Sequence, residues 1–224
     1  MMGSFFNMRS TPIVKNLVMI NIIMLGVTML TGDFMYKHFA LYYFGSDLFK
    51  PYQILSHIFM HGGVWHLVFN MYTLYIFGSV LESLWGSKKF FIYYLITGIG
   101  AALLHEFVTF LEVSSLHSAL EAGDAGSMQA YYRAIATPTV GASGAIYGLL
   151  LAYGMLFPNN IMQLVFPPIA LKAKWFVVIF GAIELFLGLS HSGGNIAHFA
   201  HLGGMLFGFF ILLYWKKKGR MYSE

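Results

Sequence analysis

The sequence contains no cysteine. Disulfide frameworks and thiolate-ligated zinc sites are therefore excluded. Charged side chains are also scarce, since Asp, Glu, Lys and Arg make up 10% of the 224 residues, against about 25% in an ordinary soluble domain. A chain of this composition has too little charge to cover a water-facing globule, so a soluble domain is excluded as well.

Apolar side chains are abundant instead, at 58% of the residues, and the mean hydropathy is +0.69. A bilayer core about 30 Å thick needs about 20 apolar residues per helix. Six stretches come near that length, of which the fourth and fifth are short: 13–30, 64–85, 90–111, 140–157, 175–189 and 196–215. The sequence predicts an all-α, polytopic bundle of six transmembrane helices, built as one membrane domain over residues 1–224.

The positions of the basic residues predict the orientation of this bundle. Six spans place ten of the 13 Lys and Arg residues on the side that holds both termini. Lys and Arg are enriched in short cytoplasmic loops, so this side is expected to be cytoplasmic. The net charge of +4 is small and follows the topology, so no nucleic-acid partner is expected.

The two long connections differ in character. Residues 31–63 are aromatic and amphipathic, which predicts an element lying at the membrane interface. Residues 112–139 are polar and join the third and fourth spans.

The fourth span opens with a serine between two glycines, in the string Gly141-Ala142-Ser143-Gly144-Ala145. The string alone is a weak signal, because small residues at a helix start also permit close packing. As a functional element, it would hold the serine at a helix N-terminus. The glycines would leave room for a substrate backbone, and free N–H groups there could bind an oxyanion.

Two polar pairs open the second and sixth spans. His66 and Asn70 are four residues apart on one helical face, and both can donate hydrogen bonds. They could serve a reacting oxygen or act as polar contacts between helices. His198 and His201 are three residues apart and share a face of the sixth span. Either of these histidines could act as a base.

Glycines predict how the fourth and sixth spans meet. Gly204 and Gly208 have small-xxx-small spacing, as Gly144 and Gly148 do, and such faces let two helix backbones approach closely. Packing through these faces would bring Ser143 to a histidine of the sixth span, which is the nucleophile–base pair that acyl transfer needs. All three motifs enter from the outer side and are expected at one depth.

In this order and at this depth, the motifs resemble those of the rhomboid family of intramembrane proteases. The resemblance covers residues 13–215 and lies in H-x-x-x-N, G-x-S-G and A-H-x-x-G-x-x-x-G (His66 and Asn70; Gly141, Ser143 and Gly144; Ala200, His201, Gly204 and Gly208). It implies a Ser–His dyad that cleaves transmembrane segments of other membrane proteins in the lipid bilayer, without metal or cofactor. The nucleophile would be Ser143, and the base would be His201 rather than His198.

The resemblance also implies supporting roles. Tyr147, one turn after Ser143, is expected to pack against the catalytic histidine, and His198 is expected to order water or substrate. The Ser143 N–H, the Asn70 side chain and His66 would stabilise the oxyanion. Because Glu106 and Glu184 are placed in the middle of their spans, no acidic third member is expected.

Two other family positions concern packing. Glu82 matches a glutamate that helps to hold helices together. Where family members often carry Trp-Arg after the first span, this chain has Tyr52-Gln53, which leaves the packing of that loop open.

Two alternative functions stay open. One is an inactive relative that binds transmembrane helices without cutting them. The other is a metal-handling or transport protein that uses histidine ligands (His57, His61, His66, His198 and His201). These histidines show no carboxylate partner in the sequence, and H-E-x-x-H is absent, which argues against a zinc metalloprotease.

The sequence shows no soluble appendage. This is typical of a minimal, prokaryote-like form in the cytoplasmic membrane, with both termini cytoplasmic and the site toward the outer face. The oligomeric state and the substrate stay open.

Overall fold

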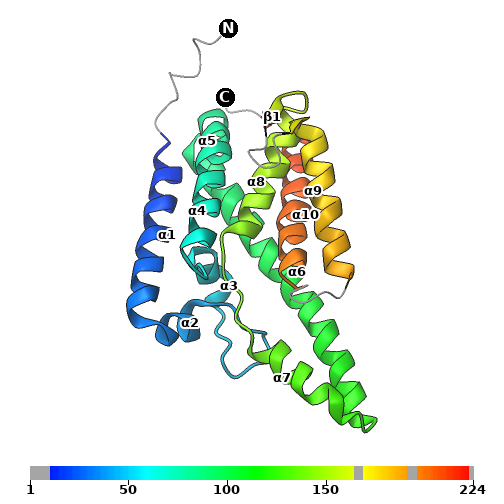
Figure 1. Cartoon of the computed structure of the whole chain (residues 1–224). Helices are drawn as coiled ribbons and strands as arrows, with labels where there is room; N and C mark the ends of the chain where they lie inside the picture. Colours follow the sequence, from blue (N-terminus) through cyan, green and yellow to red (C-terminus); the bar gives the residue numbers. More distant parts are fainter. Residues whose placement is uncertain (1–10, 164–168, 191–195, 222–224) are drawn as a thin grey trace.

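The computed structural model describes residues 11–163, 169–190 and 196–221. Within these residues the fold is all-α, apart from one short antiparallel strand pair (Figure 1). The α-helices are α1 (Pro12–Thr31), α2 (Asp33–Phe39), α3 (Gln53–Ser56), α4 (Val64–Thr73), α5 (Ser79–Trp85), α6 (Ser87–Glu121), α7 (Met128–Ala136), α8 (Ser143–Leu156), α9 (Ala173–Leu189) and α10 (Ile196–Lys217). The short elements are η1 (His57–Phe59), η2 (Leu74–Gly78, a π-helix), η3 (Ala125–Ser127), β1 (Ile161–Gln163) and β2 (Ala170–Lys172).

Four helical segments in the described residues are long and apolar enough to cross a membrane. They are α1, the continuous run of α4, η2 and α5, the helix α6, and residues His198–Lys217 of α10. The helices α8 and α9 have 14 and 17 residues, fewer than the 20 or so that a full crossing needs. The membrane helix bundle is therefore confirmed, and the number of six crossings stays a prediction.

The helix α6 is longer than the sequence predicted. Its 35 residues reach about 52 Å at 1.5 Å per residue, well beyond a hydrocarbon core. The part after residue 111 projects away from the bundle and leads into α7 (Figure 1). Good helix formers such as Leu and Ala continue past the apolar window, so the helix does not end where its hydrophobicity falls. The polar connection over 112–139 therefore begins as a helical continuation of the third predicted span.

Three helices, α6, α8 and α10, form the centre of the bundle. The backbone of Gly204 lies against the carbonyl of Gly144, where an added Cβ would collide with that carbonyl. The predicted close approach of α8 and α10 is therefore present at these two residues. Gly148 and Gly208 instead face α6, where they contact Thr97 and Tyr93. The glycines thus join three helices rather than two.

The segment between α1 and α4 is anchored by Gln53, one of the residues that replace the family's Trp-Arg. Its side chain is fully buried. The amide nitrogen donates to the carbonyls of Lys37, His38 and Leu48, at 3.3, 3.4 and 3.2 Å, and the amide oxygen accepts from the N–H of Lys50 at 3.0 Å. A single amide therefore ties α2, the loop after it and α3 together.

The same segment also supports the strand-like approach to α8. Leu41 and Thr139 exchange two backbone hydrogen bonds, at 2.9 and 2.8 Å. Further along, the N–H of Gly141 donates to the carbonyl of His57 at 3.0 Å. The start of α8 is thereby fixed from the side of α3 and η1.

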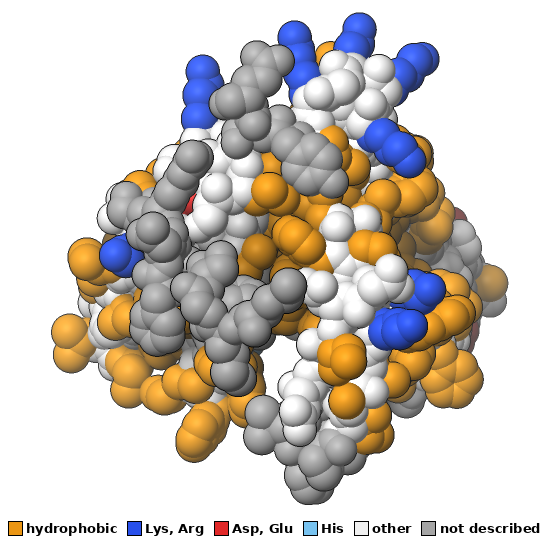
Figure 2. All heavy atoms as spheres, turned by 90° about the horizontal axis from the view of Figure 1, so that it is seen from above, with side chains coloured by type: hydrophobic (Ala, Val, Ile, Leu, Met, Phe, Trp, Pro, Cys, Tyr) orange, Lys and Arg blue, Asp and Glu red, His pale blue; other side chains and the backbone are white. Residues whose placement is uncertain are grey.

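The opposite end of the bundle holds the start of α1 and the end of α10 (Figure 1). Lys and Arg side chains stand around this face (Figure 2), with lysines at the starts of α6 and α9 and at the end of α10. Beneath it, the buried carboxylate of Glu82 accepts from the N–H groups of Ile13 and Val14, at 3.0 and 2.9 Å, and from the hydroxyl of Ser87 at 2.6 Å. Glu82 thus binds free N–H groups in the first turn of α1.

Candidate active site

Ser143 is the first residue of α8, and the backbone just before it requires glycine. Gly141 has φ of +132°, in the region that residues with a Cβ rarely adopt. An added Cβ there would also lie only 3.0 Å from Cε1 and 3.1 Å from Nε2 of His66. Gly141 therefore allows the sharp turn into α8 and the close approach of His66.

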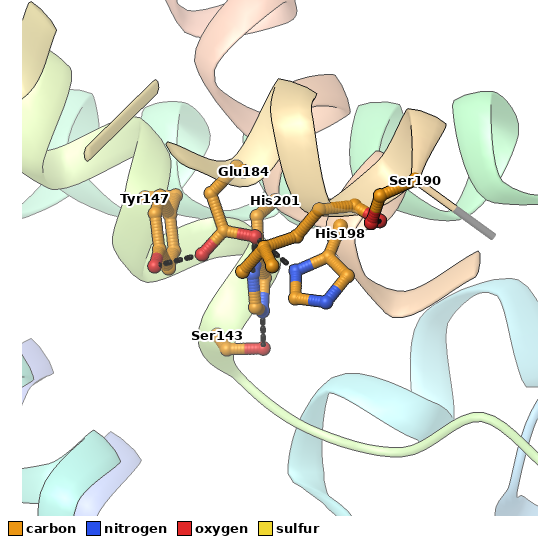
Figure 3. Close-up of polar contacts among 7 residues, drawn as sticks. Ser143, Tyr147, Glu184, Ser190, His198 and His201 are labelled. Atoms are coloured by element: carbon orange, nitrogen blue, oxygen red, sulfur yellow. Dashed lines mark hydrogen bonds and ion pairs between the residues drawn. The ribbon is translucent and has the colours of Figure 1, made fainter. Parts of the chain in front are cut away.

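The Ser143 hydroxyl and the His201 imidazole are in hydrogen-bond contact. Nε2 of His201 lies 2.8 Å from Oγ of Ser143 (Figure 3). The contact follows from the glycine packing, because Gly144 and Gly204 bring α8 and α10 together just beside it. Of the two candidate bases, His201 is the one that the structure brings to Ser143.

Tyr147 lies one turn further along α8 and covers the His201 ring. The two rings are parallel within 6°, and their centroids are 4.2 Å apart. The Tyr147 hydroxyl donates a hydrogen bond to Oε1 of Glu184. Tyr147 therefore fixes the plane of the imidazole and also contacts an acidic residue of α9.

Glu184 is the residue that sequence reasoning missed. Its side chain is largely buried, at 7% exposure, and Oε2 lies 3.0 Å from Nδ1 of His201. The Nδ1 atom makes no hydrogen bond of good geometry, so we treat the contact as a close charge interaction. Our expectation that Glu184 lies too deep to reach His201 was wrong.

The error arose because the depth of Glu184 was judged from the middle of its own span rather than from the outer end of that span. Glu184 lies five residues before the end of α9, and His201 lies five residues after the start of α10. Each is about 7.5 Å from its helix end at 1.5 Å per residue, so the two side chains are level. Counting from the shared outer ends, rather than locating Glu184 within its span, would have found the pair.

His198 meets the same carboxylate from the other side. Its Nδ1 lies 2.6 Å from Oε2 of Glu184, and its side chain is 26% exposed (Figure 3). In the described part of the chain, the donor atoms of Glu184, His198 and His201 form a cluster in which all lie within 4.8 Å of one another. His198 and His201 therefore do have a carboxylate partner, contrary to our prediction.

His66 lies on the other side of Ser143, beyond Gly141. The N–H of Gly62 donates to Nδ1 of His66 at 3.3 Å, so the ring proton belongs on Nε2, the atom that faces Gly141. One turn on, the Asn70 amide donates to the carbonyl of His66 at 2.7 Å. Asn70 also lines a cleft together with Ser143. His66 thus lies next to the serine, and Asn70 lines the same cleft as the serine.

Two other histidines are buried behind this site. Burial lowers the pKa of His57 to about 4, and burial together with the nearby His66 lowers the pKa of His61 to about 4. Both are therefore neutral at pH 7. Nδ1 of His57 lies 2.9 Å from the carbonyl of Gln53, so the His57 ring is held by the backbone of α3.

A cleft of about 750 Å³ runs from Ser143 between the α4–η2 run and the helices α8 and α9. Its walls are mostly apolar and aromatic, with Phe77, Ile146, Leu150 and Phe176 among them. Such a cleft suits an extended apolar segment better than a small polar ligand.

Known proteins share this sequence over most of its length. Residues 48–218 match the family model of the Rhomboid domain. "Rhomboid protein 1, mitochondrial" of Saccharomyces cerevisiae is 27% identical over 210 residues, covering 92% of this chain and 54% of that protein. "RHOMBOID-like protein 6, mitochondrial" of Arabidopsis thaliana is 32% identical over 173 residues, covering 76% and 46%.

A human protein, "Presenilin-associated rhomboid-like protein, mitochondrial", is 28% identical over 177 residues, covering 74% of this chain and 39% of that protein. The chain spans about half the length of the curated relatives it matches.

Proposed function

The chain belongs to the rhomboid family, as its motifs predicted, and we propose that it is an intramembrane serine endopeptidase. The family acts on transmembrane proteins within the lipid bilayer, and the apolar helices make this chain an integral membrane protein. The observation that carries the proposal is the 2.8 Å contact between Oγ of Ser143 and Nε2 of His201. A nucleophile joined to a base in this way is the arrangement that acyl transfer requires.

In the proposed reaction, Glu184 sets the proton positions on His201. The carboxylate beside Nδ1 favours a proton on that atom, which leaves Nε2 free to accept the proton of the Ser143 hydroxyl. Oγ then attacks the scissile carbonyl, and the imidazolium that forms lies beside the negative charge of Glu184. His201 gives its proton to the leaving amine as the peptide bond breaks. Water, deprotonated by His201, then hydrolyses the acyl-enzyme and restores Ser143.

The oxyanion of the tetrahedral intermediate would be bound by three donors. The N–H of Ser143 belongs to the first turn of α8, where backbone N–H groups have no partner within the helix. Nε2 of His66 and the amide of Asn70 approach from α4. Removing one such donor typically costs about 3 kcal/mol of transition-state stabilisation, which is about 100-fold in rate.

We propose that substrates are transmembrane segments of other proteins, held in the cleft between the α4–η2 run and α9. An apolar cleft matches the side chains of such a segment, and it leads to Ser143. A peptide bond within a helix is shielded, so the segment would unwind where it meets the serine. The Asn70 and Ser143 end of the cleft offers hydrogen-bond partners for the freed backbone.

We also propose that the lysine-rich face of Figure 2 is the cytoplasmic side and that the Ser143 site opens toward the other face. A prokaryotic plasma membrane was the expectation from the sequence. The relatives named above carry "mitochondrial" in their names, so an organelle membrane is the competing location, with the lysine-rich face on the corresponding inner side.

The test is cleavage of a single-span substrate by purified protein in detergent. The wild type should cut, while Ser143→Ala and His201→Ala, checked for unchanged thermal unfolding, should not. A wild type that binds transmembrane peptides without cutting any of them would instead support the inactive, helix-binding relative. Cleavage that survives His201→Ala would exclude His201 as the base.

A further inference from the structure

We propose that Glu184, His198 and His201 form an inhibitory binding site for Zn²⁺ beside the catalytic pair. The proposal rests on the proposed function, because inhibition has meaning only for an active protease. The binding itself, however, can be measured without activity. Two imidazoles and one carboxylate are a typical three-residue ligand set for zinc.

The geometry of the three donors suits a metal ion. Oε2 of Glu184 lies 2.6 Å from Nδ1 of His198 and 3.0 Å from Nδ1 of His201. A tetrahedral zinc ion with bonds of 2.0–2.1 Å holds its ligands about 3.3 Å apart, so each of these two pairs needs to separate by only about 0.3–0.7 Å. The His198 side chain is 26% exposed and can make that movement.

The other oxygen of the carboxylate and the His201 ring already have partners that would remain. Oε1 of Glu184 accepts from Tyr147, so only Oε2 is directed to the cluster. The stacked Tyr147 ring holds the imidazole of His201 in its plane. Such outer partners orient the ligands of metal sites. A water molecule would complete the four-coordinate shell.

Nitrogen-rich donors favour zinc over the hard cations. Imidazole suits Zn²⁺ and its transition-metal neighbours, whereas Mg²⁺ and Ca²⁺ prefer oxygen ligands. The His117 and Glu121 side chains, 3.4 Å apart on the exposed part of α6, provide only two ligands. They therefore serve as a comparison site for weak surface binding.

Metal binding at Nδ1 of His201 would stop the reaction. Histidine ligands bind metal as neutral imidazole, so a ring with zinc on Nδ1 carries its proton on Nε2. Nε2 would then donate to Oγ of Ser143, 2.8 Å away, and could not accept the serine proton. Protons compete with Zn²⁺ for imidazole nitrogens, so binding should tighten as the pH rises.

Binding is tested first with Ser143→Ala protein in detergent, which keeps all three donors. Titration with Co²⁺, a spectroscopic substitute for Zn²⁺, should give one equivalent of tetrahedral visible absorption, and calorimetry should show Zn²⁺ displacing it. Introducing His198→Ala or Glu184→Gln into the Ser143→Ala protein should weaken metal binding at least about tenfold. Loss of even an outer partner of a metal ligand costs about 10- to 100-fold in affinity. His117→Ala should leave binding unchanged. Unchanged affinity in the His198 and Glu184 variants, or loss in the His117 variant, would overturn the site.

Inhibition is tested with wild-type protein and a single-span substrate. Zn²⁺ should abolish cleavage at the concentrations that saturate the site, and EDTA should restore it. The half-inhibitory concentration for His198→Ala, measured against that variant's own zinc-free rate, should rise at least about tenfold. Full cleavage with the site saturated would overturn inhibition and leave the protease function standing. A protein that cuts no substrate would overturn the protease function, and the cobalt titration would still decide the metal site.

Discussion

Glu184→Gln is the substitution that most directly separates a bare Ser–His pair from one with an acidic partner. Gln keeps the size of the side chain and can still accept from Tyr147, but it carries no charge. The His201 imidazole gains a positive charge during the reaction, with Glu184 Oε2 3.0 Å from its Nδ1. Removing the carboxylate charge should therefore raise the barrier to the chemical step.

The size of the effect follows from Coulomb's law. Both charges are spread over several atoms, so their centres are about 4 Å apart, and an effective dielectric constant of 20 gives about 4 kcal/mol. Water reaches the 18% of the His201 side chain that is exposed, and it screens part of this energy. We expect a loss of about 3 to 4 kcal/mol, or about 10²- to 10³-fold in kcat at 1.36 kcal/mol per tenfold.

The assay is steady-state cleavage of a single-span substrate in detergent. KM should stay unchanged, because Glu184 itself does not line the substrate cleft. Glu106→Gln is the matched control, since Glu106 is a buried carboxylate that accepts instead from the N–H of Phe44. A kcat for Glu184→Gln within threefold of wild type, with equal thermal stability, would show that the carboxylate has no part in catalysis.

Three further substitutions test the packing around the site. Gly204→Ala should destabilise the protein by about 1–3 kcal/mol through the clash with the Gly144 carbonyl, whereas Gly26→Ala, with open space around its Cβ, should not; equal melting temperatures in detergent would contradict this. Gln53→Ala should lower the free energy of unfolding in denaturant by about 2–3 kcal/mol, because several buried hydrogen bonds of about 1 kcal/mol each disappear. An unchanged denaturation midpoint would mean that other contacts hold the loop. Burial lowers the pKa of His57 to about 4 from 6.5, so the unfolded chain binds more protons than the folded one between these values. Stability should therefore fall as the pH drops from about 6.5 to about 4. His57→Gln should flatten that dependence in thermal unfolding measured across this pH range, and an unaltered slope would assign the dependence to other groups.

Much of the bundle could be predicted because membrane helices follow simple rules of length and polarity. The run Val64–Trp85 has the bounds that the apolar window predicted. The pairing of Ser143 with His201 was also predictable, since it depends on local signals: a glycine face on each helix and a polar residue near its outer end. These signals need no knowledge of the other helices.

The features that were missed depend on how helices lie beside one another. Glu184 occurs as a lone acid in an apolar run, and only its level relative to α10 reveals its partners. Gln53 replaces a different family dipeptide, and its role depends on the carbonyls that surround it after folding. The extension of α6 beyond residue 111 was missed for another reason. Helix propensity persists there after the hydrophobic signal ends.

The presence of Glu184 bears on the choice between an active protease and an inactive helix-binding relative. An ionisable side chain within an apolar helix costs several kcal/mol of stability unless its charge is matched by hydrogen bonds and counter-charges. Here one hydroxyl and two imidazoles meet the carboxylate, and one of those imidazoles contacts Ser143. A protein that only binds helices would be served as well by a leucine at this position, with no buried charge to satisfy. That cost is explained if the carboxylate acts on a proton acceptor, so Glu184 in α9 adds to the support that Ser143 and His201 give to the proposed catalytic function.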